Sequence, residues 1–124
     1  MQEFTLIFRM NLTSGIQPTR EQIKAYMDNW MKWIDNISNQ GKLANGGNSF
    51  LPHTGKVLKS DNSISDGIYV ANEQSLAGYI VVCANNMEDA TILAKDCPIL
   101  QGQNTSVEIR QNNTTQEMKD SKRN

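Results

Sequence analysis

The sequence is poor in the residues from which most metal and redox sites are built. Among its 124 residues are only two cysteines, Cys83 and Cys97, and one histidine, His53. Neither cysteine belongs to a C-x-x-C pair, so we expect neither a disulfide framework nor a zinc site. We interpret both cysteines as small buried hydrophobic side chains in a reducing compartment, the alternative being a redox or nucleophilic role. We expect no metal and no bound cofactor.

An excess of charge of one sign is also absent. Twelve basic residues stand against thirteen acidic ones, a formal net charge of -1, so no broad field attracts nucleic acid or anionic lipid. No apolar run approaches the ~20 residues of a membrane-spanning helix. The first residues, MQEFTLIFRMNL, lack the charged-then-apolar order of a signal peptide. We therefore expect a cytoplasmic protein with neither nucleic acid nor membrane among its partners.

The common catalytic motifs are missing as well. The sequence contains no G-x-S-x-G, no phosphate-cradling glycine loop and no H-E-x-x-H, which excludes the usual hydrolases, nucleotide-binding folds and zinc enzymes. An enzyme that transfers protons without a cofactor stays open, because it needs only one carboxylate and a shaped pocket.

What the sequence does contain is a set of strand patterns. Residues 3–9, EFTLIFR, alternate with a period of two, and Ile7 leaves the second face partly apolar. Residues 77–84, AGYIVVCA, are apolar at both alternating sets, as in a strand that is covered on both faces. Residues 106–110, SVEIR, predict a half-buried closing strand.

Two helices are predicted between these strands. Thr19 and Gln22 have the spacing of a capping box, and Gly41 stands where a helix would stop. Residues 85–98 begin with an asparagine cap and an acidic first turn and end at a proline. The apolar positions of the first helix recur at three- and four-residue steps, so this helix must cover a sheet. They are Ile23, Tyr26, Met27, Trp30, Ile34 and Ile37.

The remaining segments are rich in turns. Between the first helix and the central strand, breakers surround two short strands expected near 43–48 and 56–59. From residue 111 onward the chain is polar and has no core-facing pattern. We therefore predict one domain over residues 1–110 and a disordered polar tail over residues 111–124.

The order of elements, β-α-β-β-(β)-α-β, predicts an α+β protein of ferredoxin-like type. Its two helices cover one face of an antiparallel sheet. The apolar side chains on the second face, Ile7 among them, then need cover of their own. The simplest cover is a second copy of the sheet packed about a two-fold axis, so we infer a homodimer.

Several segments, in this order, resemble the YCII-related family, also called the DGPF-domain family. The resemblance covers roughly residues 2–110: the first strand, QPTREQIKAYMDNWMKWIDNISNQGKLANGG, DGIYV leading to GYIVV, DATILAKDCPIL, and the closing strand. The family's D-G-P-F signature corresponds here to Asp66, Gly67, Ile68 and Tyr69, so the proline is lost and tyrosine replaces phenylalanine.

This resemblance implies a dimeric α/β barrel. Members of the wider superfamily include isomerases, dehalogenase-like enzymes and monooxygenases that bind small molecules between sheet and helices, often without a cofactor. A histidine–aspartate pair is suspected as catalytic in some members of the family. The histidine would lie near the start of the first helix, where this chain has none, so that pair is not carried over.

Asp66 is the candidate catalytic residue. In the functional interpretation its carboxylate faces a cleft at a strand edge, where apolar surroundings would make it a general base. In the structural interpretation Asp66-Gly67 is a tight turn, in which the aspartate caps its own backbone and the glycine takes a positive φ.

Four further residues are candidates for binding a substrate. Arg9 could hold a substrate carboxylate or form a surface ion pair. His53 could titrate near neutral pH or be an exposed loop residue without a role. Tyr69 and Tyr79 could form an aromatic wall with hydroxyl ends, or occupy half-buried strand positions.

Two functional hypotheses follow. The first is a small-molecule-binding protein, as an enzyme a cofactor-free isomerase, lyase or proton-transfer catalyst with Asp66 as base and Arg9 orienting an anionic substrate. The alternative is a non-catalytic module that senses a ligand or docks another protein. An Asp66 side chain that points into a cleft favours the enzyme, whereas one turned to solvent favours the module.

Overall fold

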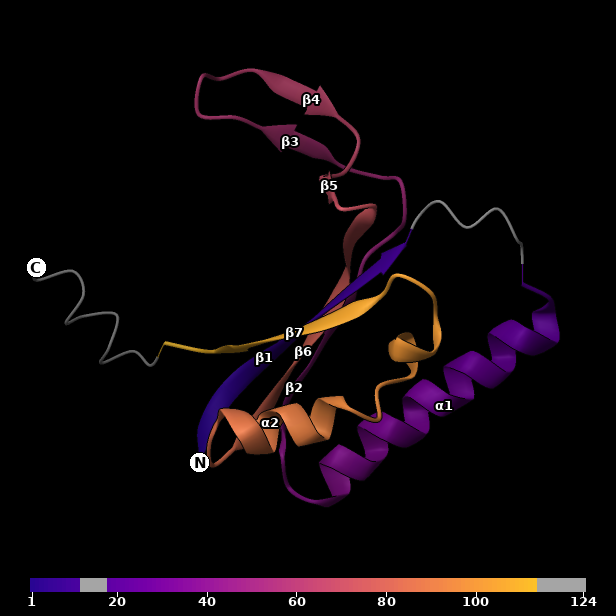
Figure 1. Ribbon diagram of the computed structural model, residues 1–124, viewed down its shortest axis with the longest axis vertical. Helices are drawn as coiled ribbons and strands as arrows, with labels where there is room; N and C mark the ends of the chain where they lie inside the picture. The colour runs from indigo at the N-terminus through magenta and orange to yellow at the C-terminus, as the bar shows by residue number, and fades with distance from the viewer. Residues whose placement is uncertain (12–17, 114–124) are drawn as a thin grey trace, which may run out of the picture.

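The computed structural model describes residues 1–11 and 18–113 of the chain. In this part, a mixed arrangement of strands and helices follows the order shown in Figure 1. The elements are β1 (Gln2–Asn11), α1 (Arg20–Asn39), β2 (Leu43–Ser49), β3 (Lys56–Leu58), β4 (Ile64–Asp66), β5 (Val70–Ala71), β6 (Gln74–Ala84), α2 (Met87–Ala94), the 3₁₀ helix η1 (Pro98–Gln101) and β7 (Ser106–Gln111).

The main sheet has the strand order β2-β6-β1-β7, and each neighbouring pair is antiparallel. The short strand β5 adds to one end of β6. Helices α1 and α2 lie on one side of this sheet (Figure 1). The chain is thus an α+β protein with two helices and a mostly antiparallel sheet, which is consistent with the predicted ferredoxin-like fold.

Helix α1 begins and ends at the residues that the sequence indicates. The hydroxyl of Thr19 accepts a hydrogen bond from the backbone N–H of Gln22 (3.1 Å), and the Gln22 side-chain oxygen accepts one from the Thr19 N–H (2.9 Å). Both halves of the capping box are therefore formed. Gly41 has a φ of 71°, the left-handed conformation that ends helices and favours glycine.

The core lies between the helices and one face of the sheet. Alternate residues of β1 and β6 point into it, and Trp33 closes it between the helices, its indole N–H donating a hydrogen bond to the Leu93 carbonyl (3.0 Å). Phe8 packs edge-to-face against Trp30, with ring centroids 5.0 Å apart. The buried apolar residues are Phe4, Leu6, Phe8, Trp33, Ile37, Ile80, Val82, Ala84, Ala90, Ala94, Cys97 and Ile99.

The other face of the main sheet, which we call the open face, carries no helix (Figure 1). It presents the alternate residues of three strands, which the pairing register brings side by side. They are Thr5, Ile7 and Arg9 of β1, Tyr79, Val81 and Cys83 of β6, and Ser106, Glu108 and Arg110 of β7. All except the exposed Arg110 are half-buried.

Strands β3 and β4 form a separate two-stranded sheet. We call residues 55–67 the arm; at its base, Gly67 N–H donates a hydrogen bond to the Gly55 carbonyl (2.9 Å). Figure 1 shows the arm beyond one end of the main sheet, away from α1. The sequence indicated a short strand at 56–59 but not that it would pair into a projecting hairpin, because strand propensity says nothing of where a hairpin packs.

Several boundaries differ from expectation. The central strand begins at Gln74, three residues earlier than expected, because β5 pairs with its start. The closing strand continues to Gln111, and Asn112 donates its backbone N–H to the Glu3 carbonyl (2.9 Å) and accepts a hydrogen bond from the Thr5 hydroxyl. Residues 111 and 112 therefore belong to the folded domain, and the expected tail from 114 lies outside the described residues.

The apolar stripe of α1 is buried only in its second half. Trp33 and Ile37 are buried, whereas Ile23 and Met27 of the first half are exposed. The first half runs beside η1, and a groove lies between the two elements. Within the described residues, neither helix is long and apolar enough to cross a membrane.

Candidate functional site

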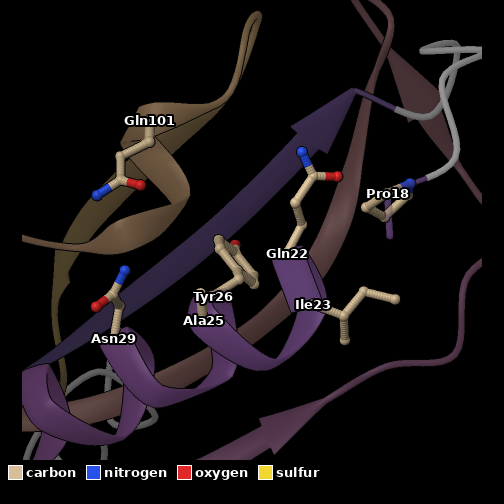
Figure 2. A pocket seen from close by; sticks show the side chains of 7 residues that line it. All are labelled: Pro18, Gln22, Ile23, Ala25, Tyr26, Asn29 and Gln101. Atoms are coloured by element: carbon tan, nitrogen blue, oxygen red, sulfur yellow. The ribbon is translucent and has the colours of Figure 1, made fainter. Parts of the chain in front are cut away.

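A groove of about 490 Å³ lies between the first half of α1 and η1. This volume falls within the range of small-molecule sites, roughly 300–1,000 Å³. Figure 2 shows Gln22, Tyr26 and Asn29 projecting from α1, with Gln101 of η1 across from them. The lining residues are Pro18, Gln22, Ile23, Ala25, Tyr26, Asn29 and Gln101.

Helical spacing places the polar groups of the groove. Gln22, Tyr26 and Asn29 are four and three residues apart, so they share one side of α1. On the opposite side, Pro98 starts η1, and the buried Ile99 anchors this short helix to the core. Gln101 at its end is exposed. A surface helix and a short turn thus present three side-chain amides and one phenol toward a common space.

The groove carries no formal charge among its described lining residues. Of its polar atoms, the Gln22 side-chain oxygen already accepts a hydrogen bond from the Thr19 N–H, and among the described residues its amide nitrogen is available to donate to a ligand. Burial raises the pKa of Tyr26 above its ordinary value, so its hydroxyl stays protonated over the physiological range. Residues 12–17, LTSGIQ, precede Pro18 in the sequence and contain no ionisable side chain. The groove therefore suits an uncharged ligand with donor and acceptor groups.

Asp66 lies at the end of β4 in the arm, and its side chain is 88% exposed. Its carboxylate forms an ion pair with the ammonium group of Lys56, its cross-strand neighbour (2.7 Å). Gly67, which follows it, has a φ of 93°. Within the described residues, no apolar cleft of the kind that the functional interpretation requires surrounds Asp66, because the arm is not part of the main sheet. The positive φ of Gly67 agrees with the turn interpretation, whereas the Asp66 carboxylate pairs with Lys56 in place of the backbone cap that this interpretation expects.

Arg9 lies on the open face and donates a hydrogen bond to the Glu108 carboxylate (2.8 Å). Arg110 approaches the other oxygen of the same carboxylate at 3.5 Å. The hydrogen bond from Arg9 is the main cause that lowers the pKa of Glu108 below its ordinary value. Arg9 thus has a partner within the chain, as in the ion-pair interpretation.

The structure separates the remaining candidates. Tyr79 lies on the open face, where its ring is 6.3 Å from that of Phe50. Tyr69 and His53 are exposed on either side of the arm along the chain. No hydrogen bond or ion pair joins any two of the five predicted site residues in the described part of the chain. Arg9 and Tyr79 share the open face, whereas Asp66 lies in the arm, with His53 and Tyr69 on either side of the arm along the chain.

The cysteines occupy two different surroundings. Cys97 is buried, and this burial raises the pKa of its thiol to about 12. Such a thiol stays protonated at neutral pH and is a poor nucleophile, in agreement with its interpretation as a small hydrophobic side chain. Cys83 is half-buried on the open face. Among the residues described, no group of three or more His, Cys, Asp or Glu side chains could hold a metal ion.

Sequence reasoning noted Gln22 only as a capping residue and did not single out the other two amides of the groove, Asn29 and Gln101. Glutamine and asparagine on a helix surface carry no signal of their own, and Gln101 meets α1 only through the tertiary fold. The one available signal was the spacing of Gln22, Tyr26 and Asn29 beside an apolar stripe.

A scan against models of protein families finds no match for this chain, and neither does a search of curated proteins.

Proposed function

We propose that this protein is a homodimeric, non-catalytic module that binds an uncharged small molecule in the groove between α1 and η1. The observation that carries the proposal is the lining of this groove. Three side-chain amides and a protonated phenol lie beside the apolar side chains of Pro18 and Ile23. None of the described lining residues carries a formal charge. Sites for small molecules combine such apolar walls with a few polar groups that fix orientation.

The position of Asp66 supports a binding module over an enzyme. A general base needs surroundings that tune it and a substrate within reach of its carboxylate. Asp66 instead faces solvent beside Lys56 on the arm. The enzyme hypothesis, with Asp66 as base and Arg9 orienting an anionic substrate, is the competing proposal. It requires Arg9 to leave Glu108 in favour of the substrate.

A ligand screen with charge as the variable tests the binding proposal. Neutral, anionic and cationic metabolites of similar size are compared by ligand-observed NMR on the wild type, on Asn29→Asp and on Asn36→Asp. Asn36 lies on α1 outside the groove lining. We expect neutral metabolites to bind the wild type. Their affinity should fall at least tenfold in Asn29→Asp and be unchanged in Asn36→Asp. Hits confined to anions, or indifferent to Asn29→Asp, would contradict the proposal.

The dimer is supported by the anatomy of the open face. Ile7, Tyr79 and Val81 form a half-buried apolar strip along β1 and β6, and the pairing register places Glu108 and Arg110 beside it on β7. An apolar centre with a charged rim is the usual composition of an interface. Because the rim holds both signs of charge, it can complement its own copy across a two-fold axis.

A matched pair of lysine substitutions tests the dimer. Val81→Lys puts a charge at the centre of the open face, and Ile92→Lys puts one on α2, where Ile92 is 59% exposed. In sedimentation velocity at micromolar concentration, we expect dimers for the wild type and Ile92→Lys and monomers for Val81→Lys. A wild type that is only monomeric would refute the dimer.

The YCII-related resemblance and a cytoplasmic location complete the proposal. The strand order β2-β6-β1-β7 with two helices on one face is compatible with that family. A cytoplasmic location is proposed from the sequence, in which two cysteines form no disulfide framework.

A further inference from the structure

Six of the exposed large apolar side chains lie in the stretch of residues 50–71. In the arm itself, Leu58 and Ile64 are direct cross-strand neighbours, and they are 70% and 63% exposed. Adjoining the arm, Phe50, Leu51, Tyr69 and Val70 are also exposed. Exposed apolar groups that gather in this way mark an interaction surface, whereas scattered ones are normal.

The arm has little support from its own subunit. Strands β3 and β4 pair only with each other and take no place in the main sheet. An isolated two-stranded hairpin is marginally stable in water, since one face cannot bury enough apolar surface. The pair Leu58 and Ile64 therefore lacks the cover that would hold this hairpin in one conformation.

The base of the arm is continuous with the open face. Phe50, a few residues before the arm, stacks beside Tyr79 of β6, and Val70 and Ala71 return the chain to the edge of the same sheet. Figure 1 shows the arm away from α1, on the side of the sheet that no helix covers. A second copy seated on the open face would meet the arm directly.

The open face alone is too small for a stable dimer interface, so a second contact area is needed. The open face as defined above has nine side chains from β1, β6 and β7, whereas a stable interface takes roughly 20–30 residues from each partner. The stretch 50–71 supplies the difference.

We infer that the arm packs on a second copy of this chain, so that two arms reciprocally clasp the dimer through Leu58 and Ile64. The inference rests on the dimer of the proposed function and extends it with a second contact area. It commits to one occupant: the partner's surface at the rim of the open face. In the free subunit the arm is exposed, and in the dimer its apolar pair is covered.

Hydrogen exchange tests the inference, because it reports on the arm alone. The amides of residues 55–67 are followed by mass spectrometry in the wild type at high and low protein concentration and in Val81→Lys. We expect exchange slowed at least tenfold in the dimer and fast in the monomer. A dimer whose arm exchanges as fast as that of Val81→Lys would overturn the clasp and leave the dimer standing, whereas a monomeric wild type would overturn both.

A double variant provides the second measurement. Leu58→Ser with Ile64→Ser removes the apolar pair but leaves the core untouched, and Ile92→Ser is the control for losing an exposed apolar side chain. We expect the dimer dissociation constant from sedimentation equilibrium to rise at least tenfold in the double variant and to hold in the control. Equal dissociation constants for the two would refute the role of the pair, provided circular dichroism shows both proteins folded.

Discussion

Gly47 holds the edge strand β2 against the central strand β6, and replacing it by alanine should cost much of the stability of the fold. A Cβ atom at this position would lie 1.7 Å from the Tyr79 carbonyl oxygen and 3.0 Å from the Ile80 Cα. These are backbone atoms of β6, so they cannot turn away as the end of a side chain could. Gly47 also has a φ of 64°, which only glycine adopts without cost.

The magnitude follows from these two effects. The left-handed backbone costs a residue other than glycine ~1–2 kcal/mol. Relief of the clash requires β2 to move away from β6, and each hydrogen bond lost adds about 0.5–1.5 kcal/mol. With two bonds lost, the free energy of unfolding should fall by about 2–5 kcal/mol.

The neighbouring residue provides the control. At Gly46 a Cβ would meet no atom within 4 Å, and its φ is not positive. Gly46→Ala should therefore stay within about 0.5 kcal/mol of the wild type. Urea denaturation followed by circular dichroism measures both variants. Equal stability of Gly46→Ala and Gly47→Ala would refute the close approach of β2 and β6 at this point.

Three further predictions concern single side chains. At pH 8, iodoacetamide should spare Cys97 in the native protein and label it after unfolding in urea, because burial raises the pKa of its thiol to about 12; equal labelling before and after unfolding would contradict its burial. Arg9→Gln should raise the pKa of Glu108 toward its ordinary value of 4.5, as measured by carbon-13 NMR. Because this carboxylate pKa is lowered in the folded state, the pair's stabilisation is present above pH 4.5 and is lost as the pH falls through the lowered pKa. Thr19→Ala should reduce the free energy of unfolding by ~1 kcal/mol through loss of the helix cap, and an unchanged urea midpoint would contradict this.

Local signals in the sequence predicted the elements that build the sheet and its helices. Thr19 and Gly41 mark the limits of α1, since capping and positive φ are local requirements. The apolar alternation of residues 77–84 identified the central strand, and Ile7 pointed to a second face in need of cover. These features depend on neighbours in the chain, so a pattern can reveal them.

The surroundings of the candidate site residues could not be predicted from local sequence patterns. Asp66 was singled out from a dipeptide, but its exposure depends on how β3 and β4 leave the main sheet. Gln101 joins Asn29 at the groove only because η1 packs beside α1. These contacts join residues that are far apart in the sequence. Amide side chains also form no periodic pattern from which such contacts could be predicted.

The most direct test of the central claim is a thermal-shift measurement with a neutral ligand on three proteins: the wild type, Tyr26→Ala and Asp66→Asn. A ligand at 100 times its dissociation constant adds ~2.7 kcal/mol to the stability of the protein that binds it, which raises the melting temperature by several degrees. The groove proposal predicts that this rise is kept in Asp66→Asn and lost in Tyr26→Ala. A rise lost in Asp66→Asn and kept in Tyr26→Ala would contradict it and move the site to the arm.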